Sequence, residues 1–229
     1  MKTIGIIGGL TWLSTVEYYK LLNQMVNERL GGAASAKILL YSVNFEEIKA
    51  LTIADDWDAI ARVIGNAAGK LEQAGADCLL LGANTMHKIA DDIRVHITIP
   101  LINIAEATAT TISRQGLKKV ALLGTKYTMQ LPFYRDKLAA QSIETIIPEG
   151  TDVEFINNAI YEEMSMNLFL PETKERFKQI IEKLTGKGAE GIIMGCTEIP
   201  ILLKDENTSV PLFDTTFIHS KAAVDFALG

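Results

Sequence analysis

The residues best suited to chemistry lie in Gly195-Cys196-Thr197-Glu198-Ile199-Pro200, where a buried strand is predicted to end. A thiol at the start of a helix lies in the positive end of the helix dipole, which lowers its pKa and raises the thiolate population. If the Glu198 carboxylate reaches the sulfur, it can instead accept the thiol proton. We therefore predict Cys196 as an acid/base and Glu198 as its partner, with a buried apolar cysteine as the alternative.

The other cysteine, Cys78, lies inside a predicted strand and is expected to be a small buried apolar residue. The three histidines, His87, His96 and His219, show no metal-ligand spacing, and no C-x-x-C or H-E-x-x-H motif occurs, so we predict no metal site. We expect His87 and His96 at the surface or at helix caps. His219, near the last strand, is a candidate to approach the site.

A glycine-rich segment, Gly5-Ile6-Ile7-Gly8-Gly9, runs from the first predicted strand into the turn after it. It lacks the order G-x-G-x-x-G, and no acidic residue lies about 20 positions on at a second strand end, so nucleotide binding is rejected. Gly8, Gly9 and Thr11 can still form a nest of backbone N–H groups for a carboxylate at a helix N-terminus. A tight strand-to-helix turn is the alternative.

Further polar side chains follow other predicted strands. Asn84, Thr85 and Thr125 stand at strand ends related to that of Thr197. Such side chains can surround a substrate carboxylate and stabilise enolate charge as a Cα–H bond breaks. Helix capping by Asn84, Thr85 or Thr197 is the alternative.

The composition favours a small-molecule ligand. The 229 residues are 48% hydrophobic, enough for a full core, and carry a net charge of −6, which argues against nucleic acid or an anionic membrane as partner. The apolar N-terminal run is too short for a signal sequence or a membrane span. Two cysteines without a signal sequence fit a reducing compartment, so we expect a cytoplasmic protein.

Short runs rich in Ile, Leu and Val alternate with longer segments of 3.6-residue periodicity, which predicts an α/β fold with mostly parallel sheets flanked by helices. The first helix is predicted to begin with a capping box, Ser14 with Glu17, and to end at Gly31-Gly32. The predicted strands are 3–7, 37–43, 77–81, 98–102, 119–123, 144–147, 191–194 and 210–213.

The sequence also contains an internal repeat. Three pairs of segments match in the same order, roughly 111–116 residues apart, as expected for a duplication. The pairs are 4–8 with 120–124, 75–83 with 188–196, and 99–101 with 210–212. We predict two quasi-duplicated lobes, 1–103 plus 210–229 and 104–209. The active site is expected in the cleft between them, because ligands bind at the carboxyl ends of parallel strands. Generic strand composition is the alternative.

At these residues the sequence resembles the aspartate/glutamate racemases that work without pyridoxal phosphate, over nearly the whole chain. The motifs are Ile6-Ile7-Gly8-Gly9-Leu10 with Thr15 and Tyr18-Tyr19, Asn84-Thr85-Met86-His87, Ala121-Leu122-Leu123-Gly124-Thr125, Gly195-Cys196-Thr197-Glu198 and Phe213-Asp214-Thr215. The resemblance implies an isomerase with two similar α/β lobes, an amino-acid substrate, no cofactor and a homodimer. It implies substrate binding by Thr11, Asn84, Thr85, Thr125, Thr128 and Thr197.

Members of that family use two cysteines on opposite faces of the substrate Cα, and the resemblance matches Cys196 to the second. Ala83 stands at the position of the first. A methyl group carries no exchangeable proton, so inversion must be slow or must use water or a neighbouring group. A decarboxylase of malonate-type acids, which needs one cysteine, and an amino-acid-binding protein without catalysis are the alternatives.

The resemblance also bears on the substrate. Aspartate-specific members place basic residues against the distal carboxylate. Lys49 is near one such position, but 162–167 contains no Lys or Arg at the other. A broader amino-acid range is therefore the alternative to strict aspartate specificity.

Overall fold

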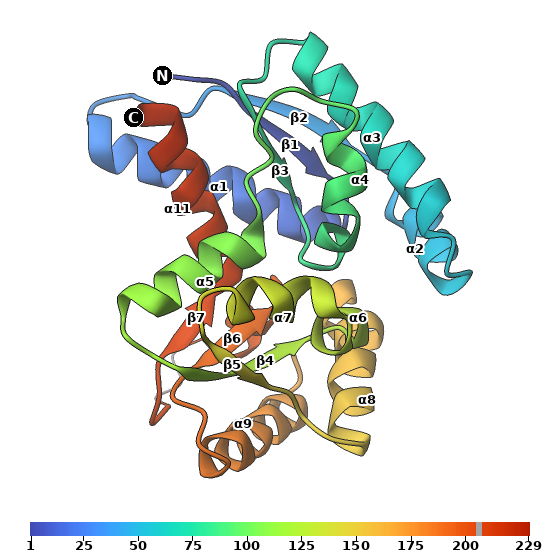
Figure 1. Cartoon of the computed structure of the whole chain (residues 1–229), viewed down its shortest axis with the longest axis vertical. Helices are drawn as coiled ribbons and strands as arrows, with labels where there is room; N and C mark the ends of the chain where they lie inside the picture. The colour runs from blue at the N-terminus through green and yellow to red at the C-terminus, as the bar shows by residue number, and fades with distance from the viewer. Residues whose placement is uncertain (205–207) are drawn as a thin grey trace. The chain divides into compact units, whose positions relative to one another are not determined.

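The computed structural model describes residues 1–204 and 208–229, and the chain divides into two compact units. Unit 1 comprises Met1–Asn103 and His219–Gly229, and unit 2 comprises Ile104–Ile218. Each unit contains one parallel sheet flanked by helices (Figure 1), which confirms the predicted α/β class. Within the described residues, no helix has the length and apolar character that crossing a membrane requires.

The sheet of unit 1 has the strand order β2-β1-β3. Its strands are β1 (Ile4–Gly8), β2 (Ile38–Ser42) and β3 (Cys78–Leu81). Successive side chains of a strand point to opposite faces, and both faces of β1 are buried because helices cover both. One face packs against α1 (Trp12–Leu30) and the part of α11 (Thr215–Leu228) within unit 1. The other packs against α2 (Phe45–Ile53), α3 (Trp57–Gln73), η1 (Thr85–Ile89) and α4 (Ala90–Arg94).

The sheet of unit 2 has the order β5-β4-β6-β7. Its strands are β4 (Lys119–Gly124), β5 (Glu144–Ile146), β6 (Ile192–Gly195) and β7 (Leu212–Asp214). One face packs against α5 (Ile104–Arg114) and α7 (Pro132–Ala139), and α6 (Lys126–Gln130) follows β4. The other face packs against α8 (Thr151–Asn158), η2 (Ala159–Glu163), η3 (Met164–Met166), α9 (Pro171–Gly186) and α10 (Ile199–Leu202).

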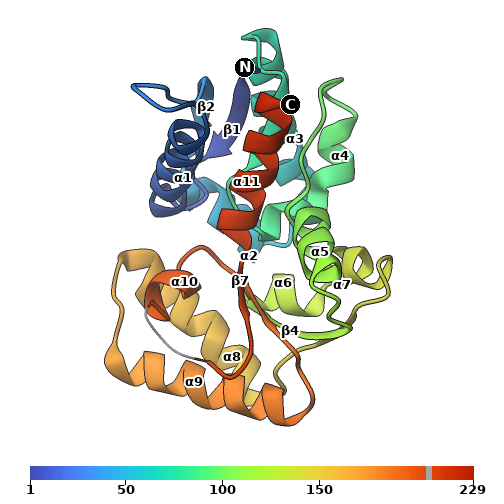
Figure 2. The ribbon, with the colours of Figure 1, turned by 90° about the vertical axis from the view of Figure 1, so that its left-hand side faces the viewer.

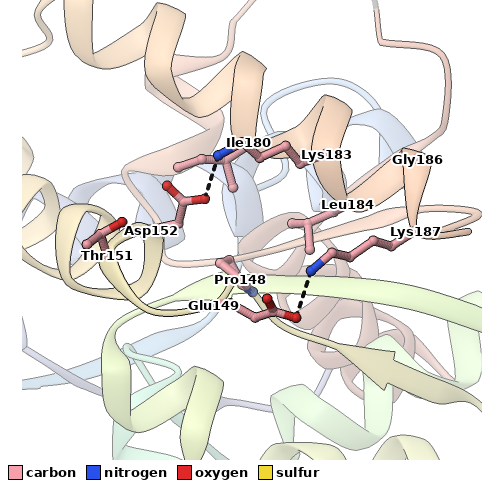
Figure 3. A pocket seen from close by; sticks show the side chains of 9 residues that line it. All are labelled: Pro148, Glu149, Thr151, Asp152, Ile180, Lys183, Leu184, Gly186 and Lys187. Atoms are coloured by element: carbon pink, nitrogen blue, oxygen red, sulfur yellow. Dashed lines mark hydrogen bonds and ion pairs between the residues drawn. The ribbon is translucent and has the colours of Figure 1, made fainter.

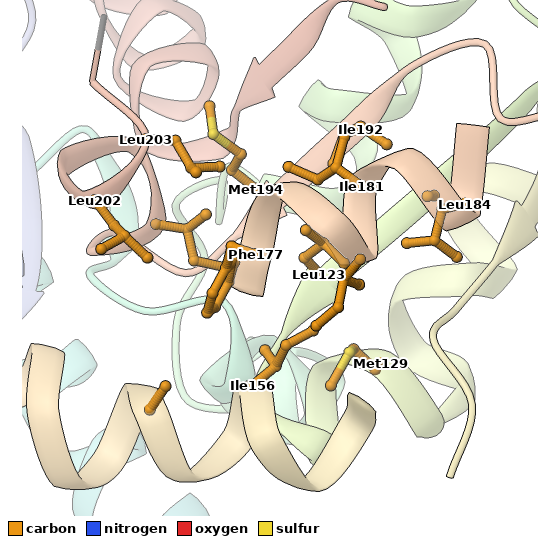
Figure 4. Packing of buried hydrophobic residues seen from close by; sticks show 14 of the residues in the cluster. Leu123, Met129, Ile156, Phe177, Ile181, Leu184, Ile192, Met194, Leu202 and Leu203 are labelled. Atoms are coloured by element: carbon orange, nitrogen blue, oxygen red, sulfur yellow. The ribbon is translucent and has the colours of Figure 1, made fainter. Parts of the chain in front are cut away.

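The core between the sheet of unit 2 and helices α8, α9 and α10 is a single cluster, and these helices lie next to each other in Figure 2. Phe177 of α9, which is fully buried, packs among Ile156 of α8, Leu123 of β4 and Met194 of β6 (Figure 4). Burying a Phe or Leu side chain contributes about 1.5–3 kcal/mol each, so this cluster fixes β4, which leads to Thr125, and β6, which leads to Cys196.

The two sheets share a topology that agrees with the internal sequence repeat. In each, the first strand of the unit lies between the next two, and β3 and β6 occupy equivalent places. The prediction of a strand at 98–102 was wrong, because only an isolated bridge, Leu79 with Leu101, forms there. Glu72 Oε1 accepts the backbone N–H groups of Thr98 and Ile99 at 2.9 and 3.1 Å, and Pro100 has no N–H to offer a ladder.

The C-terminal boundary of the lobes also differs from the sequence-based expectation. The segment 210–229 was expected to join the first lobe as one piece. Instead β7 extends the sheet of unit 2, where Leu212 pairs with Ile192 and Asp214 with Met194. Only His219–Gly229 groups with unit 1.

The first helix begins three residues earlier than the capping box predicted. Thr11, not Ser14, is the N-cap, and its hydroxyl accepts the Ser14 N–H at 3.4 Å while the two hydroxyls lie 2.8 Å apart. Ser14 therefore sits inside the first turn. The predicted end is confirmed, since Leu30 is the last helical residue and Gly31 caps it with φ +74°.

Gly9 enters the turn between β1 and α1 at φ +76°, where a Cβ would lie 2.1 Å from the Val43 carbonyl oxygen. We expect Gly9→Ala to lower the free energy of unfolding by more than about 2 kcal/mol, because backbone strain and overpacking act together. Gly31→Ala is the matched control, since Gly31 has φ +74° but no heavy atom within 4 Å. Urea denaturation should give the larger loss for Gly9→Ala, and equal losses would contradict the prediction.

Candidate functional site

Two glycines place the candidate residues of unit 2 at the carboxyl edge of its sheet. Gly124 of β4 pairs with Gly195 of β6. A Cβ on Gly124 would lie 2.8 Å from the Gly195 carbonyl oxygen, and one on Gly195 would lie 2.7 Å from that of Leu123, so neither position accommodates a side chain. Thr125 and Cys196, the next residues, therefore leave neighbouring strands at the same edge.

Cys196 forms a hydrogen-bonded cluster with the two residues that follow it. Its thiol donates to Glu198 Oε2 at 2.9 Å, and the Thr197 hydroxyl donates to the same oxygen at 2.7 Å. Glu198 is 2% exposed and Thr197 is 7% exposed, whereas Cys196 is only partly buried. A buried carboxylate thus accepts a hydrogen bond from the thiol of a partly buried residue, which is the contact between Glu198 and the sulfur that the sequence analysis took as its condition.

The predicted effect of a helix dipole on Cys196 was wrong. Helix α10 begins only at Ile199 and has four residues, so the sulfur does not sit at its first turn. Burial, and then the neighbouring negative charge of Glu198, raise the pKa of the Cys196 thiol well above its ordinary value. This shift favours the thiol form of the resting sulfur, which donates to Glu198 Oε2.

The threonines beside this cluster have local structural partners as well. Thr125 is the N-cap of α6, where its hydroxyl accepts the Thr128 N–H at 3.3 Å and lies 3.3 Å from the Thr128 hydroxyl. Thr128 is fully buried. Thr215, after β7, donates to the Met194 carbonyl at 2.8 Å and so anchors the start of α11 to β6. The capping alternative applies to Thr125 but not to Thr197, which bonds to Glu198.

In unit 1, the bonds at the end of β1 favour the tight turn, which was the alternative to a nest. The Gly9 N–H donates to the Thr15 hydroxyl at 2.7 Å, and that hydroxyl donates to the Thr11 carbonyl at 3.2 Å. This N–H is therefore already bonded within the protein. Thr11 remains at the carboxyl edge of the sheet, but as a helix cap.

The turn after β3 lies beside the end of β1, because the Gly82 N–H donates to the Ile7 carbonyl at 2.9 Å. Ala83 follows, and then Asn84 and Thr85, which are 4% and 8% exposed. Asn84 makes no side-chain capping bond to η1. The candidate residues of each unit thus lie at the carboxyl edge of its own sheet. In unit 1 these are Thr11, Ala83, Asn84 and Thr85. In unit 2 they are Thr125, Thr128, Cys196, Thr197 and Glu198.

The other cysteine and the three histidines lie outside the Cys196–Glu198 cluster. Cys78 is fully buried, as predicted, and burial raises its pKa to about 12. His96 is exposed, also as predicted. His87 and His219 are 3% and 0% exposed, so a surface position for His87 was wrong, and His219 bonds to Tyr18 Oη at 2.8 Å inside unit 1.

Sequence reasoning missed Tyr161. It lies in η2, a single π-helical turn, and such turns are frequent at functional sites. Its neighbours Ile160 and Met164 belong to the core against which Cys196 packs. Burial, followed by the charges of Cys196, Tyr127 and Glu198, raises the pKa of Tyr161. Its phenol is therefore a neutral hydrogen-bond donor near the Cys196–Glu198 pair, and no sequence pattern predicts a π turn.

A hollow of about 540 Å³ in unit 2, between α8 and the end of α9, contains none of these residues (Figure 3). Its lysines are already paired, Lys183 with Asp152 at 3.1 Å and Lys187 with Glu149 at 2.7 Å. Within 1–204 and 208–229, no three His, Cys, Asp or Glu side chains cluster in a way that could hold a metal ion.

The chain is similar to known proteins over nearly its whole length. A family model described as Asp/Glu/hydantoin racemase matches residues 7–223. The crystal structure of a candidate Asp/Glu racemase from Yersinia pestis is 47% identical, with a TM-score of 0.93 and coverage of 100% of both chains. An aspartate racemase homologue from Pyrococcus horikoshii OT3 is 35% identical, with a TM-score of 0.87 and the same coverage. The broad specificity amino-acid racemase RacX from Bacillus subtilis is 27% identical over 74% of this chain and 73% of RacX.

Proposed function

Because the chain belongs to the Asp/Glu/hydantoin racemase family, we propose that it is a cofactor-independent amino-acid racemase that moves a proton at the substrate Cα through Cys196. The observation that carries the proposal is the 2.9 Å bond from the Cys196 thiol to Glu198 Oε2. It joins a proton-carrying sulfur to a buried carboxylate that can take or return the proton.

The proposed cycle begins when Cys196 passes its proton to Glu198. The resulting thiolate removes the proton from the substrate Cα, and the electron pair of the C–H bond moves into the enolate of the substrate carboxylate. Thr197 holds Oε2 of Glu198 during this transfer, since its hydroxyl donates to the same oxygen at 2.7 Å. Return of the proton from Cys196 restores the original hand, so this face alone gives exchange with solvent.

The substrate carboxylate is proposed to bind hydroxyl and amide groups at the carboxyl edges of the sheets. Such groups stabilise the negative charge that grows on the carboxylate oxygens during proton removal. Two of them, Thr11 and Thr125, also cap helices, which holds their hydroxyls in fixed places. The proposed set is Thr11, Asn84, Thr85, Thr125, Thr128 and Thr197.

Inversion requires a proton on the opposite face, and Ala83 supplies none. We propose that water or a neighbouring group delivers it, so that Cα exchange is faster than inversion. RacX is described as a broad specificity racemase. We propose a similarly broad amino-acid range here, since 162–167 contains no Lys or Arg to select a distal carboxylate.

Proton NMR in D₂O with a panel of L- and D-amino acids tests this function. The expected result is loss of the Cα–H signal of one or more amino acids, with slower appearance of the opposite enantiomer. Absence of exchange for every amino acid would overturn the racemase proposal.

Ala83→Cys should raise the rate of inversion, by a factor on the order of 10²–10⁴, because a thiol then provides the missing acid/base. Ala83→Ser is the matched control, since a hydroxyl of nearly the same size is a far weaker acid. Chiral chromatography of the products measures both variants. Equal rates in the cysteine and serine variants would show that a proton donor at residue 83 does not limit inversion.

The second candidate is a single-cysteine decarboxylase of malonate-type acids. It is favoured by Ala83 and by the protonated resting state of Cys196, whose thiol could protonate the enediolate left by loss of CO₂. Release of CO₂ from aryl- and alkylmalonates, without exchange of amino acids, would select it over the racemase.

We propose that the protein is a homodimer and that it is located in the cytoplasm. The family resemblance supports the dimer, and two free thiols support a reducing compartment. Sedimentation equilibrium of the purified chain would test the dimer directly.

A further inference from the structure

Unit 1 contains a pair of buried imidazoles that the proposed mechanism does not use. His219 Nε2 lies 2.7 Å from the Ile102 carbonyl oxygen, which can only accept, so Nε2 carries the hydrogen. Nδ1 must then accept from the Tyr18 hydroxyl at 2.8 Å. With both nitrogens bonded, the His219 ring is held in one orientation.

His87 packs against this fixed ring. The two imidazoles meet edge to face, with centroids 5.3 Å apart and planes at 71°. His87 Nδ1 lies 3.0 Å from the Ala83 carbonyl oxygen, so it donates its hydrogen there. Nε2 then carries the lone pair, and it has no hydrogen-bond partner among the described residues. The bond from Nδ1 to the Ala83 carbonyl oxygen is therefore the directed hydrogen bond that orients the His87 ring.

Burial keeps both rings neutral. It lowers the pKa of His87 to about 4 and that of His219 to about 3, with the neighbouring His87 as the second cause for His219. At neutral pH His87 is thus a donor through Nδ1 only, and it has no charge to transfer.

The bond acts on the backbone at the edge where the candidate residues stand. A peptide group is planar, so holding the Ala83 oxygen also holds the plane that links Ala83 to Asn84. Resting on the racemase function above, we propose that His87 is a positioning residue. It fixes this peptide, and with it the directions of the side chains at 83 and 84 relative to the bound substrate.

Two amide substitutions separate positioning from packing. In His87→Asn the amide lies near the place of Nδ1 and can still donate to the Ala83 oxygen. In His87→Gln the amide extends toward the place of Nε2, where the bond to Ala83 is not available. Both variants lose the imidazole ring and should lose similar stability against urea.

The expected result is a kcat for Cα exchange lowered on the order of 10- to 100-fold in His87→Gln but largely kept in His87→Asn, because misplacing the substrate-binding Asn84 misaligns the substrate and costs rate rather than folding. Equal losses in the two variants would overturn the proposal and leave a packing role.

An NMR measurement tests the same proposal independently of enzymatic activity. Nitrogen-15 spectra should show the Nδ1–H tautomer for His87 and the Nε2–H tautomer for His219. The carbonyl-carbon shift of Ala83 should move in His87→Gln and stay in His87→Asn. If no amino acid is turned over but these shifts follow the pattern, the racemase function fails while the positioning stands. An unchanged Ala83 shift in both variants would overturn the positioning.

Discussion

Replacing Cys196 with serine is expected to slow Cα exchange by a factor on the order of 10²–10⁴, because a hydroxyl is too weak an acid to exchange protons with Glu198. Cys196 is partly buried and Glu198 is 2% exposed, so of the two side chains we place that of Cys196 against the substrate. Cys78→Ala is the matched control, since Cys78 is fully buried and should be removable without loss of exchange. Exchange that survives in Cys196→Ser would rule out the proposed base.

Glu198→Gln provides a sharper version of the same test. The amide cannot take the thiol proton, so exchange should fall by a comparable factor. The charge of Glu198 is also one cause of the raised pKa of Cys196, and its removal should lower that pKa. Alkylation of Cys196 by iodoacetamide at pH 8 should therefore become faster while exchange becomes slower. Parallel changes in both rates would contradict the role of Glu198 as proton acceptor.

The sequence predicted the strands that end at the candidate residues because buried parallel strands are continuous apolar runs. β1, β3, β4 and β6 all lie within one or two residues of their predicted bounds. The prediction failed at 98–102, where the side chain of Glu72, distant in sequence, takes the backbone N–H groups. A composition pattern carries no information on such a bond.

For the candidate residues, the sequence allowed the local hydrogen bonds to be anticipated but not the electrostatics. Cys196, Thr197 and Glu198 are adjacent in the chain, so their bonding could be anticipated. The direction of the pKa shift of the thiol could not, because it depends on how much protein surrounds the sulfur. The same limit applies to His87, a polar residue whose burial comes from packing in unit 1.

That burial has a consequence for stability in acid. The folded-state pKa values of His87 and His219, about 4 and about 3, lie below the ordinary value of 6.5 for histidine. Between these values the unfolded chain binds protons that the folded chain does not, so the free energy of unfolding must decrease as the pH falls below about 6.5. Each histidine accounts for about 2–3 kcal/mol by pH ~4.5, since one pKa unit corresponds to ~1.4 kcal/mol.

Two buried histidines should thus remove about 5 kcal/mol by pH ~4.5, a large share of the 5–15 kcal/mol typical of a folded domain. Glu72, Glu190 and Asp225 have lowered pKa values in the folded state, and they reduce the free energy of unfolding only as the pH falls below their ordinary pKa values of 4.5 and 3.8. Above pH ~4.5 the two histidines therefore dominate the pH dependence.

Trp12 and Trp57, the two tryptophans of the chain, both lie in unit 1, so their fluorescence reports its unfolding by urea at pH 7, 6 and 5. His219→Gln removes one titrating group and should roughly halve the dependence on pH. A urea midpoint that is the same at pH 7 and pH 5, or a full dependence retained in His219→Gln, would show that these imidazoles are not held neutral by the fold.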